Sequence, residues 1–209
     1  MMRISNAKVF QAVFVLVVSF LLSACGEKQV AQPQFATADI TGAPWGTDFR
    51  LNDHHGQVRS LADFRGKAVV LFFGYLNCPD VCPTTMVKLA AAMQALGDDA
   101  NRVQVLLVTL DPKRDTPEIL KQYVPAFHPA FLGLRGDEYA TSNLAKDFKL
   151  VYQPQKPNAD GFYTIDHSGG IYVFDPHGRI RLFISDEHSP DVIARDLRSL
   201  LQQSDALRG

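Results

Sequence analysis

Continuous apolar runs alternate with segments of helical period along the middle of the chain. Runs of strand length lie at residues 68–73 and 103–110, and the segment from Thr84 to Leu96 between them has the pattern of a helix. Two apolar runs separated by a helix are typical of parallel strands that are covered on both faces. The pattern therefore predicts a βαβ unit at the centre of the fold.

The rest of the chain supplies further elements on both sides of this unit. An antiparallel hairpin is indicated where two apolar runs flank the turn sequence Asp175-Pro-His-Gly178. In chain order, the pattern predicts a hairpin of residues 47–51 and 57–61, the βαβ unit, a helix from Asp115 or Thr116 to about Phe127, a strand at 131–134, a helix at 137–148, strands at 170–174 and 180–184, and an amphipathic helix at 190–202. These elements predict an α/β thioredoxin-like fold with an N-terminal β-hairpin extension and a central mixed sheet flanked by helices.

The turn of the first hairpin contains two neighbouring histidines, His54 and His55. Imidazole is a common metal ligand, but adjacent side chains in a strand or turn point in different directions. We therefore expect both histidines to be solvated turn residues.

Composition and charge describe an ordinary globular protein. The chain has 209 residues, 46% of them hydrophobic, and a net charge of −1, which suits one compact domain with a short additional segment. Lysines and arginines are spread along the chain without clustering. We therefore expect no nucleic-acid partner.

The N-terminus has the pattern of a bacterial lipoprotein signal. Arg3 and Lys8 precede an apolar run at residues 9–22, which is short for a membrane span and ends in Leu-Ser-Ala before Cys25. This predicts a signal peptide at 1–24, lipidation of Cys25, a lipid anchor and flexible tether at 25–42 and a folded domain at 43–209. The alternative is an uncleaved membrane anchor, and both place the domain in the cell envelope, facing the periplasm.

The remaining cysteines, Cys78 and Cys82, lie in the turn between the first apolar strand and its helix. Pro83 disfavours helical backbone angles at Cys82 and suits the first helical position, so we expect Cys82 at the N-cap and Cys78 in the loop before it. The positive end of the helix dipole lowers the pKa of a thiol at this position. We therefore expect two reactive thiols.

The spacing of these cysteines suggests a metal site. Two thiolates are preferred ligands for Cu(I), and a nearby imidazole would complete a three-coordinate site. The best histidine is His167, in Asp166-His167-Ser168-Gly169-Gly170, because it precedes a strand that should pack beside the cysteine turn, and Asp166 or a carbonyl could orient its ring. The alternatives are that His167 caps the following strand, that the cysteines form a structural disulfide, or that the site holds zinc with a further ligand.

Three ordered motifs together resemble the Sco/SenC family of copper chaperones over roughly residues 47–201. They are Phe73-Gly-Tyr-Leu-Asn-Cys78-Pro-Asp-Val-Cys82-Pro-Thr-Thr85, Asp111-Pro-Lys-Arg-Asp115-Thr-Pro, and Tyr163-Thr-Ile-Asp-His167-Ser with Pro176-His-Gly178. The resemblance implies a membrane-anchored thioredoxin-like domain that binds one copper, as Cu(I) or Cu(II), through Cys78, Cys82 and His167.

The resemblance also implies partners. Such proteins receive copper from an upstream donor and deliver it to the binuclear copper centre of cytochrome c oxidase, or keep the cysteines of that centre reduced. The inner membrane is favoured as the site of anchoring because the oxidase lies there. Asp111 and Asp115 match the acidic motif of the family and are candidates for supporting or docking roles, although helix capping explains Asp115 equally well.

An enzymatic function is the main alternative. The Cys78/Cys82 pair could act as a thiol-disulfide reductase in which either cysteine attacks a target disulfide. Against this function, no X-Pro dipeptide lies beside residues 165–168, where thioredoxin-like reductases usually carry a cis-proline. A peroxide-reducing enzyme on the same fold fits the paired cysteines poorly.

Overall fold

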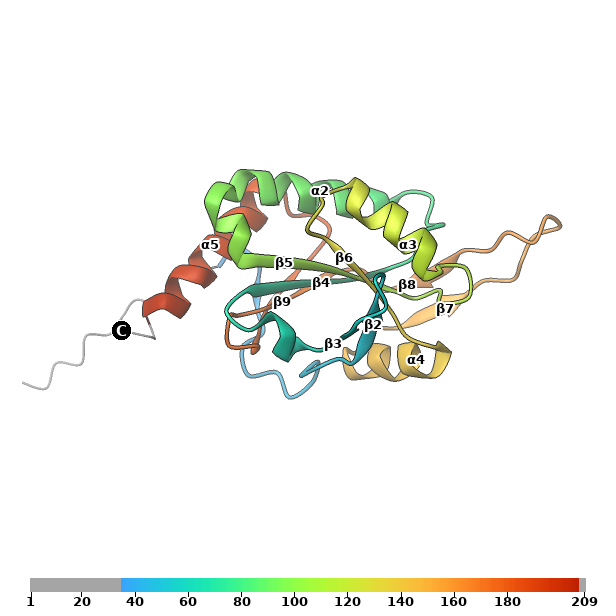
Figure 1. The fold of residues 1–209 in the computed structure, drawn as a ribbon, viewed down its shortest axis with the longest axis horizontal. Coiled ribbons are helices and arrows are strands. Elements are labelled where there is room, and N and C mark those ends of the chain that lie inside the picture. The colour runs from blue at the N-terminus through green and yellow to red at the C-terminus, as the bar shows by residue number, and fades with distance from the viewer. Residues whose placement is uncertain (1–34, 207–209) are drawn as a thin grey trace, which may run out of the picture. The chain divides into compact units, whose positions relative to one another are not determined.

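The computed structural model describes residues 35–206 (Figure 1). The predicted signal peptide at 1–24 and the predicted lipidation site Cys25 lie outside this range and remain predictions. The elements are β1 (Ala38–Asp39), β2 (Leu51–Asp53), β3 (Val58–Arg59), the 3₁₀ helix η1 (Leu61–Phe64), β4 (Ala68–Gly74), α2 (Val81–Leu96), η2 (Gly97–Arg102), β5 (Val103–Thr109), α3 (Pro117–Tyr123), η3 (Val124–Ala126), β6 (Leu132–Arg135), α4 (Glu138–Asp147), β7 (Tyr152–Pro154), β8 (Ile165–His167), β9 (Ile171–Phe174), β10 (Ile180–Ile184) and α5 (Pro190–Ala206).

The central sheet is mixed, as predicted. Its eight strands lie in the order β1-β10-β9-β4-β5-β6-β2-β3. The pairs β4–β5 and β5–β6 are parallel, whereas β9 and β10 form the predicted antiparallel hairpin and β9 pairs antiparallel with β4. The α/β fold class and the βαβ unit at its centre are therefore confirmed.

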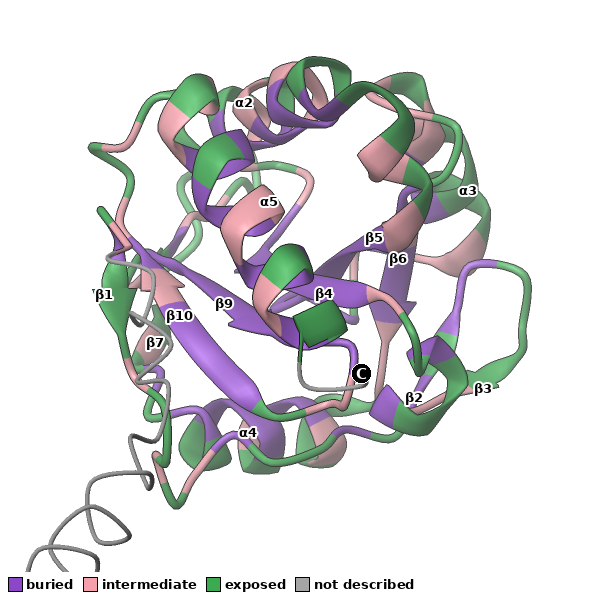
Figure 2. Ribbon diagram, turned by 90° about the vertical axis from the view of Figure 1, so that its left-hand side faces the viewer, coloured by how far each residue is buried: buried purple, intermediate pink, exposed green. Residues whose placement is uncertain are grey.

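Helices cover both faces of this sheet. The helices α2, α3 and α5 lie on one face and α4 on the other (Figures 1 and 2), and α2 packs against α5. The central strands β4 and β5 are consequently buried along their whole length (Figure 2). Burial on both faces explains why their sequences are continuously apolar rather than alternating.

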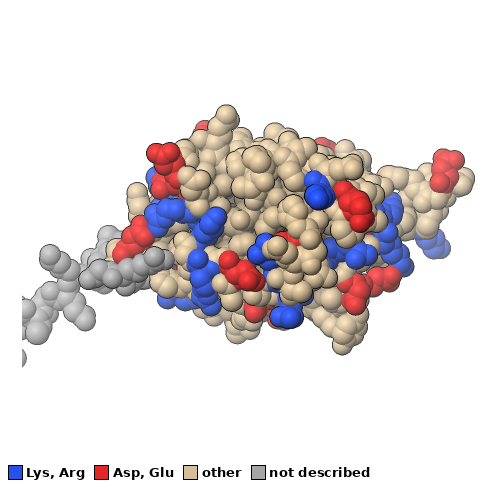
Figure 3. Space-filling view, viewed as in Figure 1, with Lys and Arg blue, Asp and Glu red and all other residues tan. Residues whose placement is uncertain are grey.

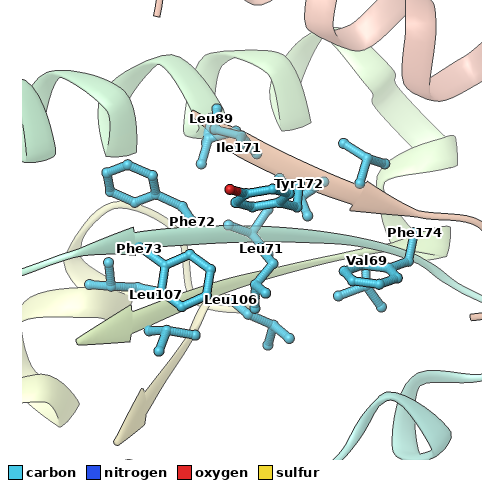
Figure 4. Close-up of a cluster of buried hydrophobic side chains, with 14 of the residues drawn as sticks. Val69, Leu71, Phe72, Phe73, Leu89, Leu106, Leu107, Ile171, Tyr172 and Phe174 are labelled. Carbon is cyan, nitrogen blue, oxygen red and sulfur yellow. The ribbon is translucent and has the colours of Figure 1, made fainter. Parts of the chain in front are cut away.

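The core is built around the aromatic residues of β4 and β9. Figure 4 shows Phe73 of β4 and Tyr172 of β9 among aliphatic side chains of neighbouring strands. The Phe73 ring packs edge-on against Phe148 and Tyr172, with centroid separations of 5.2 and 6.0 Å. Such pairs stabilise a core beyond the area that they bury. The strand that leads to the cysteines is therefore rigidly held.

The N-terminal hairpin forms as predicted, although its strands are shorter than the sequence pattern suggested. The strands β2 and β3 pair antiparallel, and β2 also joins the edge of the main sheet through β6. The prediction that both histidines of its turn are solvated is wrong for His54, which is 4% exposed. The Nδ1 atom of His54 accepts a hydrogen bond from the backbone N–H of Gly133, and its Nε2 lies 3.0 Å from Nε2 of His55. The two rings converge because tertiary packing draws one of them inward.

A second, two-stranded sheet was not predicted. It consists of β7 and β8, which pair antiparallel with Tyr152 opposite His167. Each strand is only three residues long, and the loop between them contains proline, asparagine and glycine. Strands this short leave no readable period in a sequence. The β7–β8 hairpin nevertheless determines where His167 lies in the fold.

The domain begins before the predicted boundary at residue 43. Ala38 and Asp39 form β1, which pairs with β10 at the edge of the main sheet. Just before it, the backbone N–H and hydroxyl groups of Thr37 donate to the buried carboxylate of Asp196 in α5. The last residues of the predicted tether thus belong to the folded domain. Within residues 35–206, every helix is too short or too polar to cross a bilayer.

Charges of both signs are mixed over the surface. Basic and acidic side chains lie next to one another on the face that Figure 3 presents. Ion pairs such as Arg102–Asp205 and Arg198–Asp99 join partly exposed groups. Pairs of this kind contribute only about 0–1 kcal/mol each, so they favour solubility more than stability.

Candidate functional site

The cysteine turn connects β4 to α2, as predicted, but the helix begins earlier than the sequence suggested. Its N-cap is Asp80 and its first residue is Val81, so Cys82 is the second residue of the helix and the predicted N-cap at Cys82 is wrong. Pro83 is therefore the third residue. Proline is tolerated there because the first four N–H groups of a helix have no partner within it.

Cys78 takes the position next to the helix N-terminus. Its Sγ accepts a hydrogen bond from the backbone N–H of Cys82, with a separation of 3.4 Å, and its side chain is half-buried. Burial alone would raise the pKa of the Cys78 thiol, but backbone N–H groups of Asp80 and Cys82 and the side chains of Cys82 and Tyr75 outweigh burial and hold the pKa below its ordinary value. Cys78 is therefore the acidic thiol of the pair.

Cys82 has the opposite character. It is 2% exposed, and burial, together with the neighbouring Cys78, raises the pKa of its thiol well above the ordinary value. A Cβ atom added to Gly74 would lie 2.9 Å from Cε1 of Phe72 and 3.1 Å from the Cys82 Sγ, so glycine at the end of β4 leaves room for both the ring and the sulfur. The prediction that both thiols are acidified is thus wrong for Cys82, because tertiary burial outweighs the helix dipole.

His167 lies at the end of β8 with its ring directed toward Cys82. Its Nε2 is 3.9 Å from the Cys82 Sγ, and its Nδ1 is 3.0 Å from the carbonyl oxygen of Ser168. Because a carbonyl only accepts hydrogen bonds, Nδ1 carries the proton and Nε2 presents its lone pair to the thiol. This tautomer is the one that a metal ion bound at Nε2 requires.

The separation of these two atoms suits a shared metal ion. Bond lengths of about 2.3 Å to sulfur and 2.0 Å to nitrogen, as at zinc, place the two donor atoms about 3.7 Å apart in trigonal coordination. Within residues 35–206, no three His, Cys, Asp or Glu side chains are gathered tightly enough to enclose a metal ion as they stand. Cys78, Cys82 and His167 match copper in the chemistry of their donor atoms, but they would enclose an ion only after a side-chain adjustment.

The acidic candidates occupy three different environments. Asp166 is exposed and accepts a hydrogen bond from Gln155, so the Ser168 carbonyl and not Asp166 orients the His167 ring. Asp115 is 1% exposed, and its carboxylate accepts hydrogen bonds from the Thr109 hydroxyl and the backbone N–H of Leu76, two residues before Cys78. The capping role considered for Asp115 is wrong, because Thr116 is the N-cap of α3.

Asp111 belongs to a network that reaches the His167 hairpin. Its carboxylate pairs with Arg114 and accepts a hydrogen bond from the Tyr163 hydroxyl at 3.0 Å. The Arg114 guanidinium lies 3.5 Å from the centroid of the Tyr163 ring and donates to the Tyr163 carbonyl oxygen. Sequence reasoning missed the roles of Arg114 and Tyr163, although both lie inside motifs that it had singled out.

Tyr75 is a further residue of the site whose role the sequence did not reveal. It follows the last residue of β4 and is 3% exposed. Its hydroxyl oxygen accepts a hydrogen bond from the backbone N–H of Ile165, and its ring meets His167 edge-on at a centroid separation of 6.3 Å. An aromatic residue at the end of an apolar strand carries no signal that distinguishes it from a core residue.

Comparisons with known proteins point to one family. The family model SCO1/SenC matches residues 37–202. The mitochondrial SCO2 homologue of Bos taurus is 36% identical over 175 residues, which cover 82% of this chain and 66% of the bovine protein. The copper-bound structure of ScoI from Bradyrhizobium japonicum is 34% identical, with a TM-score of 0.66, and the match covers 72% of this chain and 96% of that one. The solution structure of apo Sco1 from Thermus thermophilus is 36% identical with a TM-score of 0.66, covering 85% of this chain and 99% of that one.

Proposed function

The chain belongs to the SCO1/SenC family, and from this premise and the geometry of the site we propose that it is a copper chaperone for the assembly of cytochrome c oxidase. The observation that carries the proposal is the approach of the His167 Nε2 to the buried sulfur of Cys82, at 3.9 Å. Copper is the cargo. The copper-bound Bradyrhizobium relative supports the choice of metal.

Each ligand has a distinct part in binding. Cys78 gives up its proton more readily than an ordinary thiol, since its pKa is held below the ordinary value. Cys82 keeps its proton until copper displaces it, because burial raises its pKa. Binding therefore releases a proton from Cys82, and affinity for copper rises with pH.

Release proceeds from the more accessible ligand. Cys78 is half-buried and Cys82 is buried, so an acceptor thiolate reaches copper from the side of Cys78. The acceptor sulfur binds copper while the Cys78–copper bond breaks, and Cys82 and His167 dissociate afterwards. Thiolate exchange of this kind suits delivery to the cysteines of the binuclear copper centre of the oxidase.

The cell envelope is the proposed location. The predicted signal peptide and lipidation of Cys25 would tether the domain to a membrane, and residues up to about 37 would join the lipid to the domain. We favour the periplasmic face of the inner membrane because the proposed oxidase partner lies there, with an upstream copper donor on the same side.

The test is copper titration of the reduced, full-length protein and of single variants. Cys78→Ser and Cys82→Ser should abolish tight binding of Cu(I), because each removes one of two soft ligands. His167→Ala should weaken Cu(II) binding at least tenfold. His55→Ala is the matched control, because it removes an exposed imidazole from the β2–β3 turn and should leave both affinities unchanged. Retention of wild-type affinities in His167→Ala would remove His167 from the site.

A second function is supported by the difference between the two thiols. Cys78 is accessible and has a lowered thiol pKa, whereas Cys82 is buried and has a raised thiol pKa. This is the arrangement expected of a thiol-disulfide reductase. The Cys78 thiolate would attack a sulfur of the acceptor disulfide and release one acceptor thiolate. Cys82 would then lose its proton, attack the Cys78 sulfur and release the second thiolate, so two electrons pass to the acceptor.

The two functions are compatible, because one pair of thiols could reduce an acceptor and then supply its copper. The reduction potential of the Cys78/Cys82 pair tests the second function. A potential more oxidising than that of the acceptor disulfide would rule out reduction of that acceptor.

A further inference from the structure

The histidine and the cysteines of the site are carried by different sheets. His167 ends β8, which pairs with β7 in the two-stranded sheet, whereas the cysteine turn follows β4 of the main sheet (Figure 1). A pocket of about 480 Å³ lies between this hairpin and α4, with Tyr152 and Ile165 on one side and Glu138 on the other. Side-chain contacts rather than a shared backbone ladder must therefore fix the distance from His167 to the thiols.

Tyr75 makes these contacts on both sides of the site. Toward the cysteines, its backbone carbonyl accepts a hydrogen bond from the N–H of Cys78 at 3.3 Å. Toward the histidine, its hydroxyl oxygen accepts the N–H of Ile165 at 3.1 Å, two residues before His167. One residue thus touches both the cysteine turn and the strand that carries His167.

The hydroxyl has a defined direction. The hydroxyl oxygen accepts the Ile165 N–H, so this bond fixes the β8 backbone against the phenol group. Tyr75 is almost fully buried, so water does not compete for the bond. Tyr75 therefore joins the β8 backbone, through its hydroxyl, to the cysteine turn, through its backbone carbonyl.

We propose that Tyr75 is a positioning residue whose hydroxyl sets the place of His167 relative to Cys78 and Cys82, and so determines how tightly the site holds Cu(II) relative to Cu(I). This inference rests on the proposed copper function. Two thiolates satisfy Cu(I), which prefers soft ligands, whereas Cu(II) prefers additional ligands, including nitrogen, in a tetragonal arrangement. Displacement of the imidazole therefore weakens the binding of Cu(II) far more than that of Cu(I).

The test is the Tyr75→Phe variant of the full-length protein, which keeps the buried ring and removes only the hydroxyl. Tyr172→Phe is the matched control. It deletes a hydroxyl of similar burial that donates to the Phe148 carbonyl at 2.8 Å, outside the site. Both variants lose one buried hydrogen bond, so a purely structural effect should appear in both.

We expect Tyr75→Phe to lower the affinity for Cu(II) about tenfold and that for Cu(I) less than about twofold, since one orienting hydrogen bond is lost. The sulfur-to-copper charge-transfer band of the Cu(II) form should shift. Tyr172→Phe should leave the ratio of the two affinities and the band unchanged. Equal ratios in Tyr75→Phe, Tyr172→Phe and the wild type would overturn the proposal while leaving the copper function intact.

Amide hydrogen exchange of Ile165 in the copper-free protein separates the two proposals. Tyr75→Phe should accelerate this exchange, because the N–H loses its acceptor, and Tyr172→Phe should not. If the wild type binds no copper, the proposed function fails, and the effect on metal selectivity fails with it. Exchange at Ile165 that is unchanged by Tyr75→Phe would refute the positioning role itself.

Discussion

Replacement of Asp115 by alanine probes the link between the acidic motif and the cysteine turn. Asp115 is buried, and one of its oxygens accepts the Thr109 hydroxyl at 2.5 Å and the backbone N–H of Leu76 at 3.1 Å. Alanine removes the oxygen that accepts both bonds and leaves the Thr109 hydroxyl, which is 0% exposed, without that acceptor. The turn that carries Cys78 then loses its attachment to the end of β5.

The cost follows from these two bonds. Hydrogen bonds to charged groups contribute about 1.5–3 kcal/mol each, so their removal costs about 3–6 kcal/mol before any offset. Burial of the carboxylate, which raises the pKa of Asp115, is itself unfavourable and offsets part of the stability that these hydrogen bonds contribute. We therefore expect Asp115→Ala to lower the free energy of unfolding by about 2–4 kcal/mol.

The loss of stability in Asp115→Ala should depend on pH, and the pKa of Asp115 determines the direction of this dependence. Because the folded protein raises the pKa of Asp115 above its ordinary value of 3.8, the folded state keeps this proton to a higher pH than the unfolded chain does. Tighter binding of this proton by the folded state stabilises the fold. This stabilisation is complete below the ordinary pKa of Asp115 and declines as pH rises through the raised pKa of the folded protein. The difference in stability between wild type and Asp115→Ala should therefore be larger near about pH 4 than near about pH 7.

Urea unfolding at both pH values measures the stability, and amide exchange of Leu76 measures the turn. Asp196→Ala is the control, because Asp196 is an equally buried carboxylate that accepts the N–H groups of Ala36 and Thr37 at 2.8 Å, away from the site. It should also destabilise the protein but leave the Leu76 amide protected. Wild-type protection of Leu76 in Asp115→Ala would refute the reasoning.

Three further perturbations test neighbouring features of the site. Iodoacetamide at neutral pH should alkylate Cys78 and spare Cys82 until the protein unfolds, as read by peptide mass mapping; equal labelling would contradict the assigned pKa directions. Gly74→Ala should lower the melting temperature and weaken copper binding, because the added Cβ lies 2.9 Å from the Phe72 ring and 3.1 Å from the Cys82 sulfur; an unchanged melting temperature and affinity would show that the ring and the sulfur both move aside freely. Arg114→Lys loses the planar stacking on Tyr163 and should speed proteolysis of the 155–164 loop, with wild-type cleavage rates as the contrary result.

The parts of the fold that the sequence predicted are those with long, uniform patterns. The strands β4 and β5 are buried on both faces, so their apolar runs could be assigned from the sequence. The turn sequence Asp175-Pro-His-Gly178 likewise marked the hairpin of β9 and β10. Both signals are local, and tertiary contacts reinforce rather than override them.

The features that the sequence did not predict depend on tertiary contacts. Local helix physics favours an acidic thiol at Cys82, but the surrounding core buries this thiol and raises its pKa. His54 turns inward because Gly133, distant in sequence, offers an N–H to its ring. The strand β8 is too short to have a readable period. The ligand candidates could therefore be named from motifs, whereas the environment that distinguishes the two thiols could not.

The most direct test of the central claim is X-ray absorption spectroscopy of the copper-loaded, full-length protein. If Cys78, Cys82 and His167 together hold the metal, the copper shell of the Cu(II) form contains two sulfur scatterers and an imidazole nitrogen, and His167→Ala removes the imidazole signal while both sulfurs remain. A shell without two sulfurs, or an imidazole signal that persists in His167→Ala, would contradict the proposed site.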